Sequence, residues 1–435
     1  MKISVIGTGY VGLVTGTCLA ELGNQVICVD NDRNKIDNLK KKIVPIYEPG
    51  LEDLIKRNTA EHRLSFSTSI KEAVEKSEVI FIAVGTPSKE TGEADLTGIE
   101  SVALQIAKAM KSYRLIVEKS TVPVETGSWV EHTINVGINK KIKFDVASNP
   151  EFLREGQAIN DFMHPDRIVI GVNTQKARDT LFNLYKPLGV PIVVTDIKSA
   201  ELIKHASNSF LATKISFINA VSQICELTGA DVKKVAEGMG LDSRIGREFL
   251  NAGIGYGGSC FPKDLDAFIK ISEKYGYDFQ LLKAVKEINE KQREFFVKKI
   301  KDAIWILKGK VIGVLGISFK PNTDDIRQSP AIDIINRLIE EGASVQAFDP
   351  QAMKKSRDIL KKVKFCKDPY EASRNSDCLL ILTEWSEFKE LDFRKIRKIM
   401  KHPLIIDGRN IYDQDLLKKF GFRYISIGRS NKATT

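Results

Sequence analysis

Several features that mark other classes of protein are missing from this chain. Its six cysteines include no C-x-x-C pair and its five histidines are scattered singly, so neither a disulfide framework nor a zinc site is indicated. No apolar run reaches the ~18 residues of a membrane helix. The strand-like start M-K-I-S-V-I-G leaves no room for a signal peptide, and nucleic-acid motifs are absent. We therefore expect a cytoplasmic protein with no metal, no membrane and no nucleic-acid partner.

Length and charge limit what remains. A chain of 435 residues with 43% hydrophobic content is long enough for two or three globular domains, because single cores stop growing near ~250 residues. The formal net charge of +10 favours anionic ligands, although such an excess is often only a solvated lysine-rich surface. Phosphate-bearing small molecules are the expected partners.

The first thirty residues predict a strand, a glycine-rich turn, a helix and a second strand. The G-x-G-x-x-G at 7–12 follows the strand and opens the helix, so a pyrophosphate can rest on the helix N-terminus. Asp30 ends the second strand, where it is placed to bind ribose hydroxyls and repel a 2′-phosphate, which favours NAD over NADP. A merely structural turn is the alternative, and Arg33 and Lys35 leave NADP open.

Further strand patterns alternate with helical ones, which predicts a mostly parallel, doubly wound sheet. These strands are expected at 77–87, 114–123, 143–152 and 166–171. In such sheets ligands bind beyond the carboxyl ends of the strands. That rule selects the segments 85–87, 120–122 and 149–155, although ordinary turn chemistry also explains the first two.

One long helix is expected over 197–228, capped by Asp196 or Ser199 and stopped at Gly229. Its apolar residues cover more than one face, which favours a helix that bridges domains and packs against a partner subunit.

Lys204 and Asn208 are four residues apart on this helix and project from one face. They could stabilise an oxyanion together. A solvated polar stripe is the alternative that spacing alone favours.

The stretch G-Y-G-G-S-C-F-P-K-D at 255–264 has the character of a catalytic loop. Pro262 is expected as the first helical residue, which puts Cys260 just outside a helix N-terminus. The helix dipole and Lys263 would favour the thiolate there, and Asp264 would lie in the first turn, where it can act on a water or alcohol proton. The alternative is a glycine-rich turn with a buried structural cysteine. The other five cysteines lie in apolar patterns.

The second half repeats the strand order of the first. Strand patterns at 310–320, 343–349, 377–383 and 403–410 follow the order of those at 2–7, 25–30, 78–84 and 114–118. The turn after the first of them carries Lys320-Pro321 and 323–330 instead of a full glycine motif, which suits a phosphate held by point charges. The tail 431–435 is expected to be disordered.

The fold class is therefore predicted as α/β, with two Rossmann-like doubly wound domains joined by a long central helix. The predicted boundaries are 1–196, 197–300 and 301–435.

Six segments in this order closely resemble the UDP-glucose 6-dehydrogenase family of nucleotide-sugar dehydrogenases over nearly the whole chain. They are G-T-G-Y-V-G, S-T-V-P-V, N-P-E-F-L-R-E-G, S-N-S-F-L-A-T-K-I-S-F-I-N, G-Y-G-G-S-C-F-P-K-D and K-P-N-T-D-D-I-R-Q-S-P. The resemblance implies NAD-dependent oxidation of the sugar C6 alcohol to a carboxylate, a homodimer through the central region, and a C-terminal domain that binds the UDP-sugar.

The same resemblance implies roles for individual residues. Cys260 would attack the C6 aldehyde and carry it through a thiohemiacetal to a thioester. Lys204 and Asn208 would stabilise oxyanions, Asp264 and Thr121 would position water, and Glu151 would be a base for thioester hydrolysis.

Binding residues carry over in the same way. The cofactor contacts would be Gly7, Gly9, Tyr10, Val11, Gly12, Asp30, Lys35, Thr86, Thr121, Glu155, Lys263 and Arg327. The substrate contacts would be Glu151, Phe152, Leu153, Arg154, Lys204, Asn208, Arg244, Phe249, Leu250, Asn251, Gly253, Gly255, Tyr256, Gly257, Phe319, Lys320 and Arg409. Arg244 would reach the neighbouring subunit's site. Lys35 and Tyr256 depart from the Arg and Phe usual in the family but keep charge and shape.

Other functions remain open at this point. A sister enzyme acting on GDP-mannose or a UDP-N-acetylhexosamine shares the thiol loop, and a catalytically silent nucleotide-sugar binding protein would share the fold. A two-electron 3-hydroxy-acid dehydrogenase would leave Cys260 without a role. Carrying an aldehyde to an acid by hydride transfer requires a tetrahedral adduct, which a thiol supplies.

Overall fold

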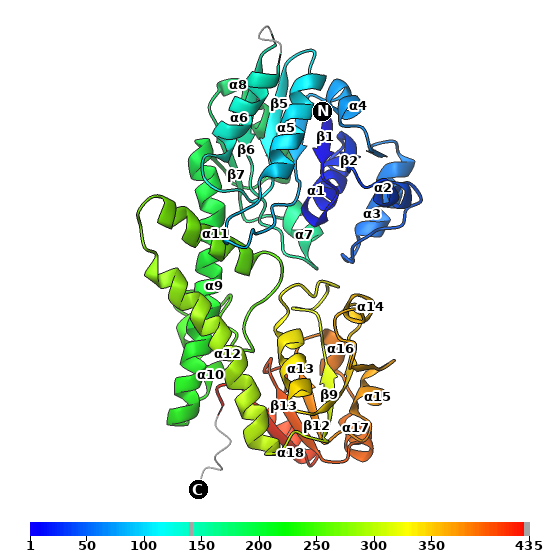
Figure 1. The fold of residues 1–435 in the computed structure, drawn as a ribbon, viewed down its shortest axis with the longest axis vertical. Coiled ribbons are helices and arrows are strands. Elements are labelled where there is room, and N and C mark those ends of the chain that lie inside the picture. Colours follow the sequence, from blue (N-terminus) through cyan, green and yellow to red (C-terminus); the bar gives the residue numbers. More distant parts are fainter. Residues whose placement is uncertain (139–141, 430–435) are drawn as a thin grey trace. The chain divides into compact units, whose positions relative to one another are not determined.

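The computed structural model describes residues 1–138 and 142–429, so the tail predicted to be disordered lies outside the described residues. The chain divides into two compact units, each with its own sheet (Figure 1). Unit 1 holds residues 1–207 and 266–277, and unit 2 holds 208–265 and the chain from 278 onward. Two helices contribute to both units: α9 (Ile197–Thr228) and α11 (Phe261–Lys274). The three-part boundaries expected from the sequence stay a prediction.

Unit 1 is built on an eight-stranded sheet in the order β3-β2-β1-β4-β5-β6-β7-β8. All neighbouring pairs are parallel except β6 with β7. The sheet is therefore mostly parallel, as the alternating pattern predicts. The strands are β1 (Lys2–Ile6), β2 (Gln25–Val29), β3 (Leu64–Ser67), β4 (Val79–Ile82), β5 (Arg114–Glu118), β6 (Phe144–Ser148), β7 (Ile168–Val172) and β8 (Ile192–Thr195).

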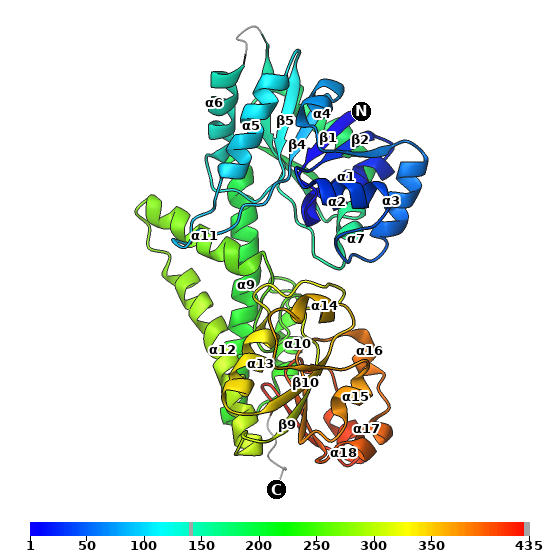
Figure 2. The same cartoon turned by 45° about the vertical axis from the view of Figure 1, so that its right-hand side comes forward.

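Helices cover both faces of this sheet because successive residues of its buried strands point to opposite sides. Val79 and Phe81 of β4 pack with one set of helices, α1 (Tyr10–Glu21), α3 (Leu51–Ala60), α7 (Ala158–Met163) and α8 (Gln175–Tyr185). Ile80 and Ile82 pack on the other side with α4 (Ile70–Lys76), α5 (Thr97–Ala109), α6 (Thr126–Gly137) and the start of α9. Figure 2 shows α5 and α6 on the side of the sheet away from α1 and α3. The short α2 (Arg33–Lys40) follows β2.

Unit 2 contains a six-stranded parallel sheet in the order β11-β10-β9-β12-β13-β14. Its strands are β9 (Val311–Leu315), β10 (Ser344–Phe348), β11 (Lys364–Phe365), β12 (Cys378–Ile381), β13 (Leu404–Asp407) and β14 (Arg423–Ser426). One face packs against the C-terminal part of α9 with α10 (Val232–Gly240), α12 (Gln280–Ile304) and α13 (Pro330–Glu340). The other packs against α15 (Pro369–Ser373), α16 (Ser386–Lys389), α17 (Phe393–Ile399) and α18 (Gln414–Lys419). The single-turn α14 (Met353–Ser356) follows β10.

The predicted repeat of strand order is confirmed. The order β2-β1-β4-β5 in unit 1 matches β10-β9-β12-β13 in unit 2. Four strands were not predicted: β3, β8 and β14 have only four residues each, and β11 has two. β3 reads L-S-F-S and β14 reads R-Y-I-S, so each mixes polar with apolar residues over too short a stretch to stand out.

The long helix α9 begins and ends where its sequence predicts. The Asp196 carboxylate accepts the backbone N–H of Ser199 at 2.8 Å, which identifies Asp196 as the cap. Gly229 follows the helix in the left-handed conformation, with φ of 85°, and ends it. Within residues 1–138 and 142–429, no helix has the length and apolarity that crossing a membrane requires. No group of three or more metal-ligating His, Cys, Asp or Glu side chains gathers in the same residues.

Candidate active site

The glycine-rich turn between β1 and α1 leaves the start of α1 open. A Cβ on Gly7 would lie 2.5 Å from the carbonyl oxygen of Ala83, and one on Gly12 would lie 1.8 Å from the carbonyl oxygen of Gly7. A Cβ on Gly9 would meet nothing within 4 Å. Gly9 caps α1 without a side-chain hydrogen bond, and no acidic residue stands in the first turn, which includes Tyr10 and Val11. The start of α1 therefore has space beside Gly9 and no side chain that caps it, which suits a pyrophosphate.

Asp30 lies directly after β2 and is held by hydrogen bonds from its own neighbourhood. One carboxylate oxygen, Oδ2, accepts the Thr8 N–H at 2.9 Å, the Thr8 hydroxyl at 2.7 Å and the Lys35 ammonium at 2.9 Å. The other, Oδ1, accepts only the Asp32 N–H, at 3.0 Å, among the described residues. Burial opposes ionisation, but these hydrogen bonds outweigh it and lower the pKa of Asp30. The ionised Oδ1 keeps a lone pair for a ribose hydroxyl.

Two predicted residues from neighbouring strand ends lie together in unit 1. The Thr86 hydroxyl donates to the backbone carbonyl of Thr121 at 2.9 Å. The Ser120 hydroxyl donates to the Val84 carbonyl at 2.7 Å, which fastens the loop after β5 to the loop after β4. Thr121 itself is partly exposed. Both loops lie at the carboxyl edge of the sheet, where a ligand of this fold binds.

Lys204 belongs to a buried charge cluster rather than to a solvated stripe. Its ammonium is 3.1 Å from the Glu151 carboxylate, and the two side chains are 5% and 4% exposed. The Lys119 ammonium, which donates to Asn149 Oδ1 at 3.0 Å, also faces this pair. Burial lowers the pKa of Lys119 to about 8, and the positive charge of Lys204 acts in the same direction. Asn208 is also buried. The solvated-stripe alternative is therefore excluded.

Local contacts fix the segment after β6. The other Glu151 oxygen accepts the Leu153 N–H at 2.6 Å. The Phe152 ring lies under the Arg167 guanidinium, 3.8 Å from its carbon, while Arg154 pairs with Asp161 at 2.6 Å. Glu155, like Phe152 and Leu153, is partly exposed.

Sequence reasoning missed two buried groups beside these residues. Glu48 accepts the N–H groups of Gly156 and Ala158 at 2.6 and 2.8 Å and bonds the Tyr10 hydroxyl, so it ties the segment after β6 to α1. Lys119 was passed over inside the strand pattern R-L-I-V-E-K. The available signal was the adjacent Glu and Lys at the end of this apolar strand. Charged residues are rarely buried without a partner, so such a position indicates a buried charge with partners.

In unit 2 the thiol loop ends at a helix start, close to the prediction. The backbone N–H of Asp264 donates to the Cys260 carbonyl at 2.8 Å, so Cys260 flanks the helix as its cap. α11 begins at Phe261, so Pro262 is the second helical residue, and the prediction that it is the first was wrong by one position. Cys260 is held where helix N–H groups and the helix dipole favour a thiolate.

Asp264 joins two of the predicted residues. Its Oδ2 accepts the Asn208 amide at 2.6 Å, and its Oδ1 accepts the Lys263 ammonium at 2.7 Å. The carboxylate is 1% exposed. The carboxylate and the lysine of the first turn after Cys260 therefore lie together, and the carboxylate also contacts the Asn208 amide of α9.

The six cysteines differ in exposure. Cys18, Cys28, Cys225, Cys366 and Cys378 are buried, and burial raises the pKa of each of these thiols. Cys260 is the partly exposed one of the set. The alternative of a buried structural cysteine at this position is therefore excluded.

Glycines let the thiol loop pack closely on unit 2. Asn289 of α12 accepts the Tyr256 N–H at 2.8 Å, and a Cβ on Gly255 would lie 2.7 Å from the same amide oxygen. A Cβ on Gly257 would lie 2.2 Å from the Gln328 carbonyl, and one on Gly258 would lie 2.7 Å from the Phe319 ring. The loop thus lies against the long segment that follows β9.

The remaining predicted substrate residues of this loop are anchored nearby. Asn219 accepts the Gly253 N–H at 2.8 Å, and Arg247 donates to Asn251 at 2.9 Å. Leu250 is buried in the core of unit 2, while Phe249 takes a left-handed φ of 64°. Its ring lies 6.2 Å from that of Phe261.

Side chains after β9 and β13 converge on the same loop. Arg409 donates to the carbonyls of Phe319 and Gly255 at 3.2 and 3.4 Å. The Lys320 ammonium lies 5.4 Å from the Phe319 ring centre. Arg327 pairs with Asp325 at 2.7 Å, and its carbonyl accepts the Gly258 N–H at 3.0 Å. This edge of the unit 2 sheet carries three cationic side chains around a glycine-rich backbone.

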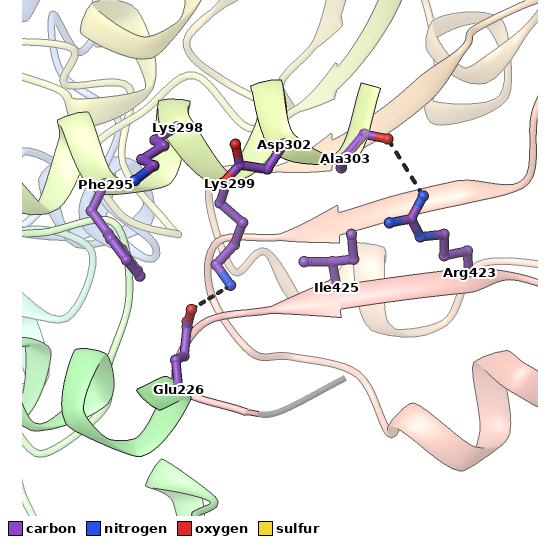
Figure 3. Close-up of a pocket in the computed structure, with 8 residues that line it drawn as sticks. All are labelled: Glu226, Phe295, Lys298, Lys299, Asp302, Ala303, Arg423 and Ile425. Atoms are coloured by element: carbon purple, nitrogen blue, oxygen red, sulfur yellow. Dashed lines mark hydrogen bonds and ion pairs between the residues drawn. The ribbon is translucent and has the colours of Figure 1, made fainter. Parts of the chain in front are cut away.

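Arg244 stands apart from this group. Its side chain is 87% exposed and forms a local ion pair with Asp242 at 2.6 Å. An open cleft of about 290 Å³ also lies elsewhere in unit 2. Figure 3 shows it between the end of α9, α12 and β14, with Lys299 paired to Glu226 and Arg423 directed at the Ala303 carbonyl. None of the predicted site residues lines it.

Comparison with known proteins covers all three parts of the chain. Residues 1–189 match the NAD binding domain of the UDP-glucose/GDP-mannose dehydrogenase family, 198–291 match its central domain, and 313–414 match its UDP binding domain.

Individual relatives are similar over almost their full length. A UDP-glucose 6-dehydrogenase of Bacillus subtilis is 51% identical over 98% of this chain and 93% of its own. One from Rhizobium meliloti is 48% identical over 99% and 100%. The solved structure of a UDP-glucose dehydrogenase from Pyrobaculum islandicum matches with a TM-score of 0.89 and 41% identity over 94% of both chains.

Proposed function

Because the chain belongs to the UDP-glucose/GDP-mannose dehydrogenase family, we propose that it oxidises the C6 alcohol of UDP-glucose to the carboxylate of UDP-glucuronate. The observation that carries the proposal is the placement of Cys260, a partly exposed thiol at a helix start. A simple alcohol dehydrogenase needs no nucleophile, whereas a four-electron oxidation does. Overall, one alcohol, one water and two NAD⁺ become one carboxylate, two NADH and three protons.

The N-terminal residues fit the coenzyme. Gly9 leaves the start of α1 open to a pyrophosphate, and the ionised Asp30 suits ribose hydroxyls. NAD⁺ bound there supplies the hydride acceptor for both oxidations. Thr86, Thr121 and Glu155 at the neighbouring strand ends complete the proposed coenzyme contacts of unit 1. Lys263 and Arg327 are the coenzyme contacts proposed for unit 2 by family resemblance.

The unit 2 residues suit the sugar nucleotide. A diphosphate would be held by Lys320 and Arg409, since Lys and Arg favour phosphate oxygens. The backbone of 251–257 would contact the sugar, since glycines there permit close approach. The proposed sugar contacts of unit 1 are Glu151, Phe152, Leu153 and Arg154.

Cys260 acts after the first oxidation has produced the C6 aldehyde. Its thiolate adds to the carbonyl carbon, the carbonyl electron pair moves to oxygen, and the oxygen takes a proton to give a thiohemiacetal. Removal of the second hydride from C6, with loss of the hydroxyl proton, leaves a thioester. Water then adds to the thioester, the carbon–sulfur bond breaks, and the thiolate is released as the carboxylate forms.

Buried polar residues are proposed to stabilise the charges in these steps. Lys204 and Asn208 are proposed to stabilise the oxyanions, since their donors are buried and oriented by carboxylates. Asp264 and Thr121 would position water for proton transfer. Glu151, ionised beside Lys204, is the proposed base that takes a proton from the hydrolytic water.

The test is the yield of NADH from a limiting amount of UDP-glucose. We expect two NADH per sugar from the wild type, and a yield of one would reject the thioester route. The Cys260→Ser variant should bind both nucleotides but lose turnover by at least about 1,000-fold, since a serine hydroxyl is far less nucleophilic at neutral pH. GDP-mannose and UDP-N-acetylglucosamine in the same assay test the sister activities.

We also propose a cytoplasmic homodimer formed through α9. In unit 2 this helix exposes Phe210, Phe217, Ile224 and Leu227, and the first three recur every seven residues on one face. All six cysteines are thiols, as in a reducing compartment.

The exposed Arg244 would reach the substrate of the partner subunit in this dimer. Arg244→Ala should then raise the KM for UDP-glucose by about tenfold, as expected for loss of one charged phosphate contact. Co-expression with Cys260→Ser sharpens the test, because a mixed dimer would contain one complete site. Recovery of wild-type KM in the mixture supports the dimeric site, and an unchanged KM in Arg244→Ala alone removes the residue from it.

A further inference from the structure

Two buried glutamates in unit 1 take no part in the proposed chemistry. Glu118 is the last residue of β5 and is 1% exposed, and Glu201 lies on α9 and is 2% exposed. Both carboxyl groups face Gly127 in the first turn of α6, where a Cβ would lie 3.5 Å from an oxygen of each. Two acidic groups therefore face one point that solvent barely reaches.

The two glutamates differ in the hydrogen bonds that their oxygens accept. Glu201 accepts the backbone N–H groups of Glu125 and Gly127, each at 2.8 Å, one on each oxygen. Neither oxygen of Glu118 accepts from an N–H or O–H donor within the part of the chain that the structure describes. The Glu201 carboxyl faces the same point as these two oxygens. A buried carboxylate with no donor of its own is strongly disfavoured beside a second acid, so one of the two carries a proton.

The surroundings decide which glutamate is protonated. Burial raises the pKa of Glu118 well above its ordinary value, and the charge of Glu201 acts in the same direction. Burial raises the pKa of Glu201 only to about 7, because the two backbone N–H bonds favour its charged form. Glu118 is therefore the protonated acid of the pair, and Glu201 is the ionised one. The other charged groups nearby are Lys198 on α9 and the Glu125 side chain, which pairs with Lys198 and Lys274 at 3.3 and 3.5 Å.

The segment held by Glu201 is the one that carries Thr121. Residues 119–127 leave β5 at Glu118 and enter α6, and Glu125 in this segment has an unfavourable φ of 81°. Its other anchors include the Ser120 and Lys119 hydrogen bonds described above, the Thr86 hydroxyl on the Thr121 carbonyl at 2.9 Å and the His205 ring nitrogen on the Val122 carbonyl at 2.8 Å. Among these anchors the Glu201 carboxylate alone changes with the charge of a neighbouring acid.

We propose that Glu118 and Glu201 share one proton and together act as positioning residues that hold the 119–127 segment, and with it Thr121, in place. Loss of the shared proton would leave two carboxylates in contact in a buried site, and their repulsion would release the segment. The importance of this positioning for turnover rests on the proposed function of Thr121.

Two isosteric variants separate this role from simple structural support. Glu118→Gln keeps a donor toward Glu201 that cannot be deprotonated, so turnover at pH 7 should stay within about twofold of the wild type. Glu201→Gln puts an amide donor against a backbone N–H, so turnover should fall by about tenfold. Between pH 7 and 10 the wild type should lose turnover through the pair by up to about tenfold per pH unit, and Glu118→Gln should lack this part of the decline.

The unfolding midpoint of the full chain gives a readout that needs no substrate. A carboxyl group with a raised folded pKa contributes stability below its unfolded pKa, and this contribution is lost as the pH rises toward the folded value. The wild-type midpoint should therefore fall with rising pH more steeply than that of Glu118→Gln.

Equal alkaline declines in the two proteins, for both turnover and midpoint, would overturn the shared proton. Equal losses of turnover at pH 7 in Glu118→Gln and Glu201→Gln would overturn the positioning role. If the wild type oxidised no UDP-glucose yet its midpoint showed the predicted difference from Glu118→Gln, the proposed function would fail while the shared proton would be supported.

Discussion

The two sheets of this protein share the same interactions at the ends of their first two strands, but they differ in which groups remain available to a ligand there. In each unit a glycine in the left-handed region follows the first strand, Gly7 with φ of 103° and Gly316 with φ of 94°. In each, an aspartate follows the second strand and accepts N–H groups from the loop after the first strand, Asp30 from Thr8 and Asp349 from Ile317. The same interactions therefore form the strand ends in both units.

The difference lies in what those interactions leave available. Asp30 Oδ1 accepts one hydrogen bond, from the backbone N–H of Asp32. In contrast, both oxygens of Asp349 accept hydrogen bonds from groups of unit 2. Its Oδ2 accepts from Ile317, Ser318 and Trp385, and its Oδ1 accepts from Gln351 and Ala352. Asp349 is a structural carboxylate, although it occupies the position that is proposed to bind a ribose in unit 1.

The two units also differ in where the helix after the first strand begins. In unit 1 the turn enters α1 at Tyr10, three residues after Gly7. In unit 2 the helix α13 does not begin until Pro330, and the intervening segment carries Phe319, Lys320 and Arg327. Unit 1 is thus suited to bind phosphate with backbone N–H groups, and unit 2 with side-chain charges.

The largest expected effect comes from closing the backbone site of unit 1. Gly12→Ala would place a Cβ 1.8 Å from the Gly7 carbonyl oxygen, so α1 must move away from its turn. NAD⁺ affinity should fall by more than about 100-fold, because such overpacking costs on the order of 3 kcal/mol. Calorimetric titration with NAD⁺ and with UDP measures both sites, and UDP affinity should be unchanged. Wild-type NAD⁺ binding in this variant would contradict the main-chain site.

A smaller effect is expected from removing one charge in unit 2. Lys320→Ala should weaken UDP binding by about tenfold, the usual cost of one charged phosphate contact. Raising the salt concentration should weaken UDP binding to the wild type more than to this variant, because screening acts on the missing charge. Lys361→Ala, at an exposed lysine of the same unit, is the matched control. Identical UDP affinities for the two variants would show that unit 2 does not bind phosphate through Lys320.

Local signals predicted much of this architecture. The bounds of α9 followed from Asp196 and Gly229, and the strand order of unit 2 followed from its repeat of unit 1. Cys260 stood out because it alone among the six cysteines lay outside an apolar pattern. In the structure it is partly exposed, whereas the other five are buried. These features are encoded within a few residues of one another, which a sequence displays directly.

Pairings across long sequence separations could not be predicted in the same way. Lys204 had the spacing of a solvated stripe, and only its contact with Glu151, 53 residues earlier in the chain, made it a buried ion pair. Glu201 looks like an ordinary surface acid in sequence, and the end of an apolar strand does not tell that Glu118 is buried beside it, because burial is decided by what packs around each residue. Asp349 matches Asp30 in pattern, and its six accepted hydrogen bonds become evident only in the fold.

The smallest expected effect on nucleotide binding separates these two aspartates. Asp30→Asn would remove the charge that pairs with Lys35 at 2.9 Å and leave that lysine available to a 2′-phosphate. The preference for NAD⁺ over NADP⁺ should therefore fall by about fivefold to tenfold, as measured by the ratio of the two kcat/KM values. Asp349→Asn should leave this ratio unchanged but lower the unfolding midpoint, since an amide group would face backbone N–H donors at a cost of about 1–3 kcal/mol. If Asp349→Asn changed coenzyme preference, or Asp30→Asn did not, the two strand ends could not differ in the way their hydrogen bonds indicate.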